Sequence, residues 1–267
     1  MEQKQPEFIS SFKNPKIQFI RGLLLSHKAR EENHACVLEG VRLAEEAIGS
    51  GIVPQIAVFS DRLSERGMQL VNSLFERTCQ VIKVPQELFS RISATESDQG
   101  LLLVIALPKP NFPERADFVL ILDGIKDPGN MGTILRTAAA AGTQLVIAAP
   151  GCVDIYSPKV LRSGMGAHFS LPVIEMSWPQ IVQTHQKQPQ IPGVFVAESS
   201  QGKPIWKIDF TKPAWVIIGG EAEGAGKEAQ KAATDFVLIP MPGKSESLNA
   251  AIAAGIILFE IVRQRSK

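Results

Sequence analysis

Residues 117–149, DFVLILDGIKDPGNMGTILRTAAAAGTQLVIAA, decide the fold class of the C-terminal part of this 267-residue chain. The apolar run at 118–125 predicts a buried strand, and a loop rich in glycine and proline follows it at 126–132. A helix is expected over 133–142, ending at a glycine, and the apolar run at 144–150 predicts a second strand. Strand, helix and strand in this order predict a βαβ unit and therefore a parallel sheet.

Upstream of this unit, three prolines fall within residues 108–113. Proline at this density disfavours both helix and central strand, so a linker is expected at 109–116. It would separate a domain at 1–108 from a domain at 117–267. The first domain alternates strand and helix patterns at short spacing, which predicts a smaller α/β layer.

The composition is that of an ordinary globular protein, with 45% hydrophobic residues, 21% charged residues and a net charge of +1. The three cysteines form no CxxC pair and the four histidines have no ligand spacing, so neither a disulfide framework nor a metal site is expected. The N-terminus lacks an apolar signal core, and the longest apolar stretch, 248–262, is too short to span a bilayer. A cytoplasmic protein without a membrane partner is expected. Residues 1–30 carry six Lys or Arg against two Glu, a local excess that suits phosphate contacts or a solvated helix face.

A glycine-rich loop after a strand also suits a nucleotide, but the common nucleotide-binding motifs are absent here. The dinucleotide pattern GxGxxG does not follow the strand at 118–125. The phosphate loop GxxxxGK[ST] fails at Gly226-Lys227 and at Gly243-Lys244, because neither has the first glycine. Both NAD-dependent enzymes and NTPases are therefore disfavoured.

Three blocks remain: DPGNMGTILRTAAAAG at 127–142, IIGGEAEGAG at 217–226 and IPMPGKSESLNAAIAAG at 239–255. Their order, spacing and residues closely resemble the three motifs of the SpoU family of RNA 2'-O-ribose methyltransferases, the TrmH-like branch of the SPOUT class. The resemblance implies an α/β catalytic domain with a parallel sheet and a deep trefoil knot, S-adenosylmethionine as cofactor, and a homodimer whose active site lies close to the subunit interface. VLEGVRLAEEAI at 37–48 and SDQGLLLVIA at 97–106 add a weaker similarity to kink-turn-binding ribosomal proteins, which implies an RNA-binding first domain.

Six residues are expected to bind the cofactor, since tight glycine turns allow a ligand to approach the backbone closely. For Gly219, Ile239 and Leu248 the resemblance itself implies a place in the pocket. The full predicted set is Gly219, Gly220, Gly224, Ile239, Met241 and Leu248.

Five residues are expected to be catalytic: Asn130, Arg136, Glu221, Ser247 and Asn249. The resemblance implies that Arg136 acts on the ribose hydroxyl as a base, but a guanidinium stays protonated, so a phosphate clamp is preferred and the base role is left open. Asn130 would hydrogen-bond the ribose or Arg136, or cap the helix that follows it. Glu221 would orient Arg136 or accept a proton. Ser247 and Asn249 would bind substrate or fix the knot, and Ser247 is also a natural helix cap.

The substrate expected from the two-domain layout is large-subunit (23S) ribosomal RNA, and no DNA partner is expected. The expectation of a ribosomal RNA substrate rests on analogy with proteins of the same fold. Two alternatives stay open: a tRNA ribose 2'-O-methyltransferase with the same chemistry, and a non-catalytic RNA-binding assembly factor that retains the fold.

Overall fold

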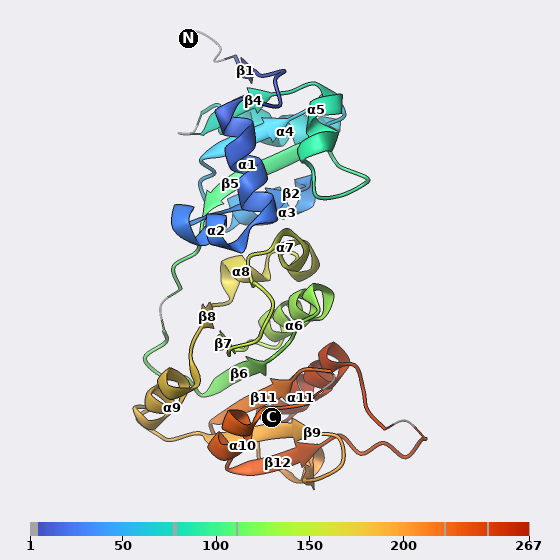
Figure 1. The fold of residues 1–267 in the computed structure, drawn as a ribbon. Coiled ribbons are helices and arrows are strands. Elements are labelled where there is room, and N and C mark those ends of the chain that lie inside the picture. The colour runs from blue at the N-terminus through green and yellow to red at the C-terminus, as the bar shows by residue number, and fades with distance from the viewer. Residues whose placement is uncertain (1–4, 77–78, 111, 222, 245, 267) are drawn as a thin grey trace. The chain divides into compact units, whose positions relative to one another are not determined.

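The computed structural model describes residues 5–76, 79–110, 112–221, 223–244 and 246–266, so Ala222 and Ser245 of the second and third blocks lie outside the described residues. The chain forms two compact units (Figure 1). Unit 1 comprises Met1–Pro108 and Tyr156–Phe169, and unit 2 comprises Lys109–Ile155 and Ser170–Lys267. Each unit has a hydrophobic core of its own.

Unit 1 is an α/β layer built on a five-stranded sheet. Its strands are β1 (Glu7–Phe8), β2 (Ala35–Glu39), β3 (Ile56–Phe59), β4 (Gln80–Lys83) and β5 (Leu101–Ala106). Its helices are α1 (Pro15–Leu25), α2 (His27–Asn33), α3 (Val41–Gly49), α4 (Glu65–Leu74), α5 (Gln86–Ile92) and α7 (Pro158–Gly164), and α8 (Ala167–Ser170) lies at its boundary.

The sheet of unit 1 has the order β1-β4-β3-β5-β2 and mixes parallel with antiparallel pairs. Alternate strand residues point to opposite faces, and each face carries a separate cluster of buried side chains. Side chains from α3 and α4 belong to one cluster, and side chains from α1 and α5 belong to the other. The segment Tyr156–Phe169 joins this unit through α7, where a guanidinium nitrogen of Arg162 donates to Glu39 at 2.9 Å.

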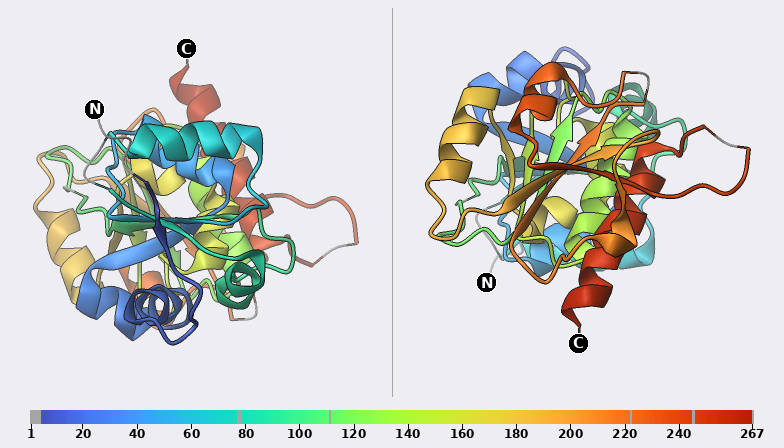
Figure 2. Two further views of the ribbon diagram at one scale, coloured as in Figure 1. Left: turned by 90° about the horizontal axis from the view of Figure 1, so that it is seen from above. Right: turned by 90° about the horizontal axis from the view of Figure 1, so that it is seen from below.

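Unit 2 contains a seven-stranded sheet with helices on both faces (Figure 2). Its strands are β6 (Phe118–Asp123), β7 (Leu145–Ala148), β8 (Val173–Glu175), β9 (Gly193–Glu198), β10 (Lys203–Pro204), β11 (Ala214–Gly219) and β12 (Asp235–Leu238). Its helices are α6 (Pro128–Ala140), α9 (Trp178–Gln186), α10 (Lys227–Ala232) and α11 (Ala250–Arg265), with a 3-10 turn at Ile205–Lys207.

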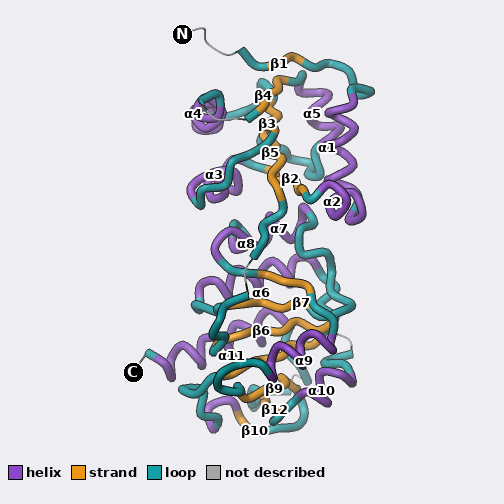
Figure 3. The backbone as a smooth tube through the Cα atoms, turned by 90° about the vertical axis from the view of Figure 1, so that its left-hand side faces the viewer, coloured by secondary structure: helices purple, strands orange, loops and turns teal. Residues whose placement is uncertain are grey.

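The sheet of unit 2 is parallel throughout, in the order β10-β12-β9-β11-β6-β7-β8, as the βαβ pattern predicted. The tube drawing shows these strands stacked between purple helices (Figure 3). Side chains of α9 and α10 share one core with the sheet, while α6 and α11 pack against each other and α11 contacts β11. Strand β6 is buried along its whole length, as expected for a central parallel strand covered on both faces.

The beginning of α6 differs from the prediction. Residues 128–132 were expected to be loop, but the helix already begins at Pro128 because the side chain of Asp127 accepts a hydrogen bond from the backbone N–H of Asn130 at 2.7 Å. Proline at the first helical position has no N–H to leave unpaired and a φ suited to the helix. The proline that suggested a loop is therefore part of the helix start.

Within the described part of the chain, none of the helices combines the length and the apolar character needed to cross a lipid bilayer.

Candidate active site

Unit 2 contains a cavity of about 330 Å³ at the carboxyl ends of its central strands. Its wall is formed by the ends of β9, β11 and β12 and by the start of α11. The lining residues are Ala197, Glu198, Ser199, Ile218, Gly219, Gly220, Glu221, Glu223, Gly224, Val237, Ile239, Met241, Ser247, Leu248, Ala250, Ala253 and Ile257. In parallel α/β sheets this edge is where ligands bind.

All six residues predicted to bind the cofactor line this one cavity: Gly219, Gly220, Gly224, Ile239, Met241 and Leu248. They come from two loops that follow β11 and β12, so the structure brings the second and third sequence blocks together. Their contact with a cofactor remains a prediction.

The loop after β11 leaves no room for side chains at its first two glycines. A Cβ on Gly219 would lie 2.2 Å from the carbonyl carbon of Gly224, and a Cβ on Gly220 would lie 2.5 Å from the carbonyl oxygen of Gly124. Gly224 has a φ of +64°, which side-chain-bearing residues rarely adopt. The backbone therefore turns back on itself, and the N–H of Gly224 donates to Gly220 O at 3.0 Å.

Asp123 holds the far end of the same loop. It is buried at the end of β6, opposite Gly219 in the sheet register, and its Oδ2 accepts the N–H of Gly226 at 2.7 Å. Asp123 is not among the residues predicted from the sequence. A carboxylate at the last position of an apolar strand was the available signal, because charged residues are rarely buried unless they are paired.

A chain of hydrogen bonds joins one residue from each of the three blocks. The side-chain amide of Asn130 donates to Glu221 Oε1, and Asn249 Nδ2 donates to Asn130 Oδ1 at 3.1 Å. The side chain of Asn130 makes no hydrogen bond with Arg136, which was one of its three expected roles. Glu221 lines the cavity, so the chain ends with a carboxylate next to the space where a ligand fits.

The helix caps differ from those predicted. Asp127, rather than Asn130, caps α6. Asn249, rather than Ser247, caps α11, since its Oδ1 accepts the N–H groups of Ala251 at 2.9 Å and Ile252 at 3.3 Å. Ser247 instead lines the cavity.

Arg136 is not brought into the cavity. Its side chain is exposed on α6 and makes no hydrogen bond or ion pair with any residue the structure describes. The carboxylate of Glu221 accepts a hydrogen bond from Asn130 and is not brought to Arg136 in this structure, so a role of Glu221 in orienting Arg136 stays a prediction.

Two further groups near this edge bear on the chemistry. Glu198 ends β9 and lines the cavity half-buried, which the sequence analysis did not single out. The thiol of Cys152 donates to Leu122 O at 3.2 Å near the end of β6, and burial raises its pKa to about 11. The thiol therefore stays protonated at neutral pH and is a poor nucleophile.

Comparison with known families gives two matches that together cover most of the chain. Residues 117–259 match the SpoU rRNA Methylase family, and residues 14–103 match the MRM3-like substrate binding domain. The 23S rRNA (guanosine(2553)-2'-O)-methyltransferase RlmP of Bacillus subtilis is 31% identical over 254 residues, which cover 95% of this chain and 98% of that protein.

Two crystal structures with the cofactor bound are similar over nearly their whole length. One is the AdoMet-bound rRNA methyltransferase from Sinorhizobium meliloti, with a TM-score of 0.85 and 28% identity, covering 97% of this chain and 98% of that one. The other is the SpoU methyltransferase AviRb from Streptomyces viridochromogenes in complex with AdoMet, with a TM-score of 0.83 and 28% identity, covering 95% and 99%.

Proposed function

Because the chain belongs to the SpoU rRNA methylase family, we propose that it transfers the methyl group of S-adenosylmethionine to a ribose 2'-hydroxyl of large-subunit (23S) ribosomal RNA. The observation that carries this proposal is the cavity where loops from the second and third blocks meet. The carboxylate of Glu221 lines it and is hydrogen-bonded to Asn130 of the first block. Similarity to 23S rRNA methyltransferases extends through both units, which favours ribosomal RNA over tRNA.

The cavity fits S-adenosylmethionine on three counts. Its volume of about 330 Å³ is in the range of small-molecule sites. The loop at Gly219 and Gly220 presents bare backbone, where adenine or the methionine part can approach N–H and C=O groups. Glu198, Glu221 and Glu223 give the wall a negative charge that suits a ligand carrying a sulfonium and an ammonium group. The deep trefoil knot implied by the family resemblance stays a prediction.

The cofactor supplies an activated methyl group, and the protein must align the acceptor oxygen with it and remove the hydroxyl proton. Asn130 and Asn249 hold Glu221 at the cavity wall, where its carboxylate is placed to accept a hydrogen bond from a ribose hydroxyl. The guanidinium of Arg136 is exposed, which suits a clamp on a phosphate of the RNA. In this assignment Arg136 orients the nucleotide and is not the base.

The active form is proposed to be a homodimer built on α11. Three large apolar side chains, Ile252, Ile256 and Phe259, are 55%, 39% and 49% exposed. Their spacing of four and three residues places them on one helix face, and an exposed apolar stripe of this kind marks an interaction site. The partner proposed is a second copy of this chain. α11 packs on α6, so such an interface would also lie near Arg136.

Replacing Ile256 and Phe259 together by glutamate should convert the dimer to a monomer, because two charges would have to be buried in an apolar contact. Light scattering coupled to size-exclusion chromatography measures the mass directly. Ile191→Glu, at a residue of unit 2 that is 64% exposed outside α11, serves as the control and should leave the mass unchanged. A double variant that stays dimeric would place the interface elsewhere.

The test of function uses ribosomal RNA from cells lacking the protein as acceptor. We expect methyl incorporation at one nucleotide of 23S rRNA and none in tRNA from the same cells. A fragment with a 2'-deoxy sugar at the mapped nucleotide should accept no methyl, since the acceptor oxygen is missing. Methyl transfer to the deoxy fragment would identify a base atom as acceptor. Failure to bind S-adenosylmethionine by calorimetry would instead favour an inert assembly factor.

A further inference from the structure

Two arginines of unit 1 share one aromatic ring. The guanidinium carbon of Arg21, on α1, lies 5.1 Å from the ring centroid of Phe12, and that of Arg91, on α5, lies 4.2 Å from the same centroid. Phe12 is half-buried and packs on the cluster formed by α1, α5 and the sheet. The ring is thus anchored in the core and holds two exposed cations close together.

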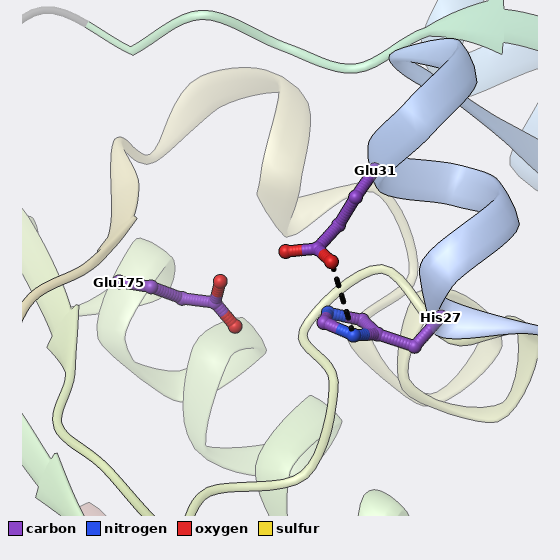
Figure 4. A group of neighbouring side chains, drawn as sticks. All are labelled: His27, Glu31 and Glu175. Carbon is purple, nitrogen blue, oxygen red and sulfur yellow. Dashed lines mark ion pairs between the residues drawn. The ribbon is translucent and has the colours of Figure 1, made fainter.

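In the described part of the N-terminal segment, from residue 5 to residue 30, most other cations are already paired. Lys16 contacts Glu7 at 2.6 Å and Lys28 contacts Glu32 at 3.6 Å. His27 Nδ1 lies 3.6 Å from Glu31 (Figure 4, where the third side chain, Glu175, belongs to unit 2). Arg30 is buried and donates to the carbonyl oxygens of α1.

Arg21 and Arg91 differ from these residues, because neither side chain forms an ion pair or hydrogen bond with any described residue. Glu87, one turn before Arg91 on α5, comes within ion-pair distance of neither. Lys13, which follows Phe12 in the sequence, is also exposed and has no carboxylate partner in the described chain. Like charges held close together repel each other, and an anion bound between them relieves that repulsion.

We propose that Arg21 and Arg91, organised by Phe12, form a docking site for the RNA substrate outside the nucleotide that receives the methyl group. The proposal rests on the proposed function, since that function provides the polyanion. Guanidinium groups form bidentate hydrogen bonds with phosphate and carboxylate oxygens alike, but only RNA also offers unpaired bases that stack on them, so RNA is favoured over an acidic protein. The Phe12 ring keeps both guanidinium groups in place before the RNA binds, which lowers the conformational entropy lost on binding.

The test compares full-length Arg21→Ala/Arg91→Ala protein with wild type in binding to a 23S rRNA transcript at several salt concentrations. We expect about 10-fold weaker binding at moderate salt. The slope of log K against log salt should fall by about 1.4, because each lost contact to single-stranded RNA removes about 0.7. In methyl transfer the KM for RNA should rise by a similar factor, while kcat and the Kd of S-adenosylmethionine stay unchanged.

Arg66→Ala is the matched control. It also removes one exposed arginine from unit 1, but Arg66 is already paired with Glu45 at 2.6 Å and lies on α4, across the sheet. It should change neither the binding nor the salt slope. Arg21→Lys/Arg91→Lys should restore the salt slope, since both charges return.

The outcomes separate this proposal from the proposed function. If wild type methylates rRNA but the double alanine variant binds RNA with unchanged affinity and slope, the docking site is wrong and the function stands. An equal loss of RNA affinity in the Arg66→Ala control would also overturn the docking site, because the loss would then not be specific to Arg21 and Arg91. If wild type transfers no methyl to RNA, the proposed function fails, and the salt-slope comparison still decides whether this cluster binds RNA.

Discussion

Gly219→Ala is expected to lower the affinity for S-adenosylmethionine by at least about 100-fold, because the added methyl group occupies space that the backbone already fills. The new carbon would lie 2.2 Å from Gly224 C and 2.2 Å from Ala225 N, distances at which atoms overlap. The loop cannot simply move away, since Asp123 holds Gly226 and Gly220 is close to Gly124 O. Overpacking of this kind costs about 1–3 kcal/mol of folding free energy.

The measurements are calorimetric titration with the cofactor and thermal unfolding of the same samples. Gly243→Ala is the matched control: it lies in the third block, has an ordinary φ, and a Cβ there meets nothing within 4 Å. Its stability should stay within about 0.5 kcal/mol of wild type. Wild-type cofactor affinity in a folded Gly219→Ala protein would show that this loop does not hold the cofactor.

The strand pattern made the sheet of unit 2 predictable, because its residues are apolar and continuous. The runs expected at 118–125 and 144–150 correspond to Phe118–Asp123 and Leu145–Ala148. Their side chains are buried on both faces of the sheet, so each strand appears in the sequence as an uninterrupted apolar run. The glycine motifs were predictable for a related reason, since close backbone approach permits no other residue at Gly219.

The contacts between blocks could not be predicted from spacing. Asn130 is separated by 91 residues from Glu221 and by 119 from Asn249, and only the folded sheet brings the three together. Two residues compete for each cap, Asp127 with Asn130 and Ser247 with Asn249, and all four are good caps by type. Local geometry decides between them: Pro128 sets the start of α6 at Asp127.

Asp123 and Glu198 belong to none of the three motifs, but their positions in the sequence are informative. Each is an acidic residue at the last position of an apolar strand, and parallel strands bring those positions to one edge of the sheet. Position relative to strand ends would have identified both as neighbours of the glycine loops. Arg136 is the opposite case, since the motif identified it but its position within one chain leaves it outside the cavity.

Arg136→Ala is expected to lower the rate of methyl transfer about 1000-fold while the Kd of S-adenosylmethionine stays within about twofold of wild type. The two effects separate because Arg136 does not line the cavity, so its loss removes no cofactor contact. What is lost is the alignment of the nucleotide, and misplacing a reacting group by about 1 Å can cost about 100-fold or more. Single-turnover transfer of labelled methyl to rRNA, alongside calorimetry, measures both quantities.

A lysine variant tests how Arg136 acts. Arg136→Lys keeps the charge but loses the planar guanidinium group. A phosphate clamp therefore predicts a methyl-transfer rate about 10- to 100-fold above that of Arg136→Ala. Arg115→Ala is the control, since Arg115 is 68% exposed in the same unit but is paired with Asp117 at 2.7 Å, and it should transfer methyl at the wild-type rate. Undiminished transfer by Arg136→Ala would remove this residue from the mechanism. A lysine variant as inactive as alanine would contradict a role based on charge alone and would require the bidentate geometry of the guanidinium.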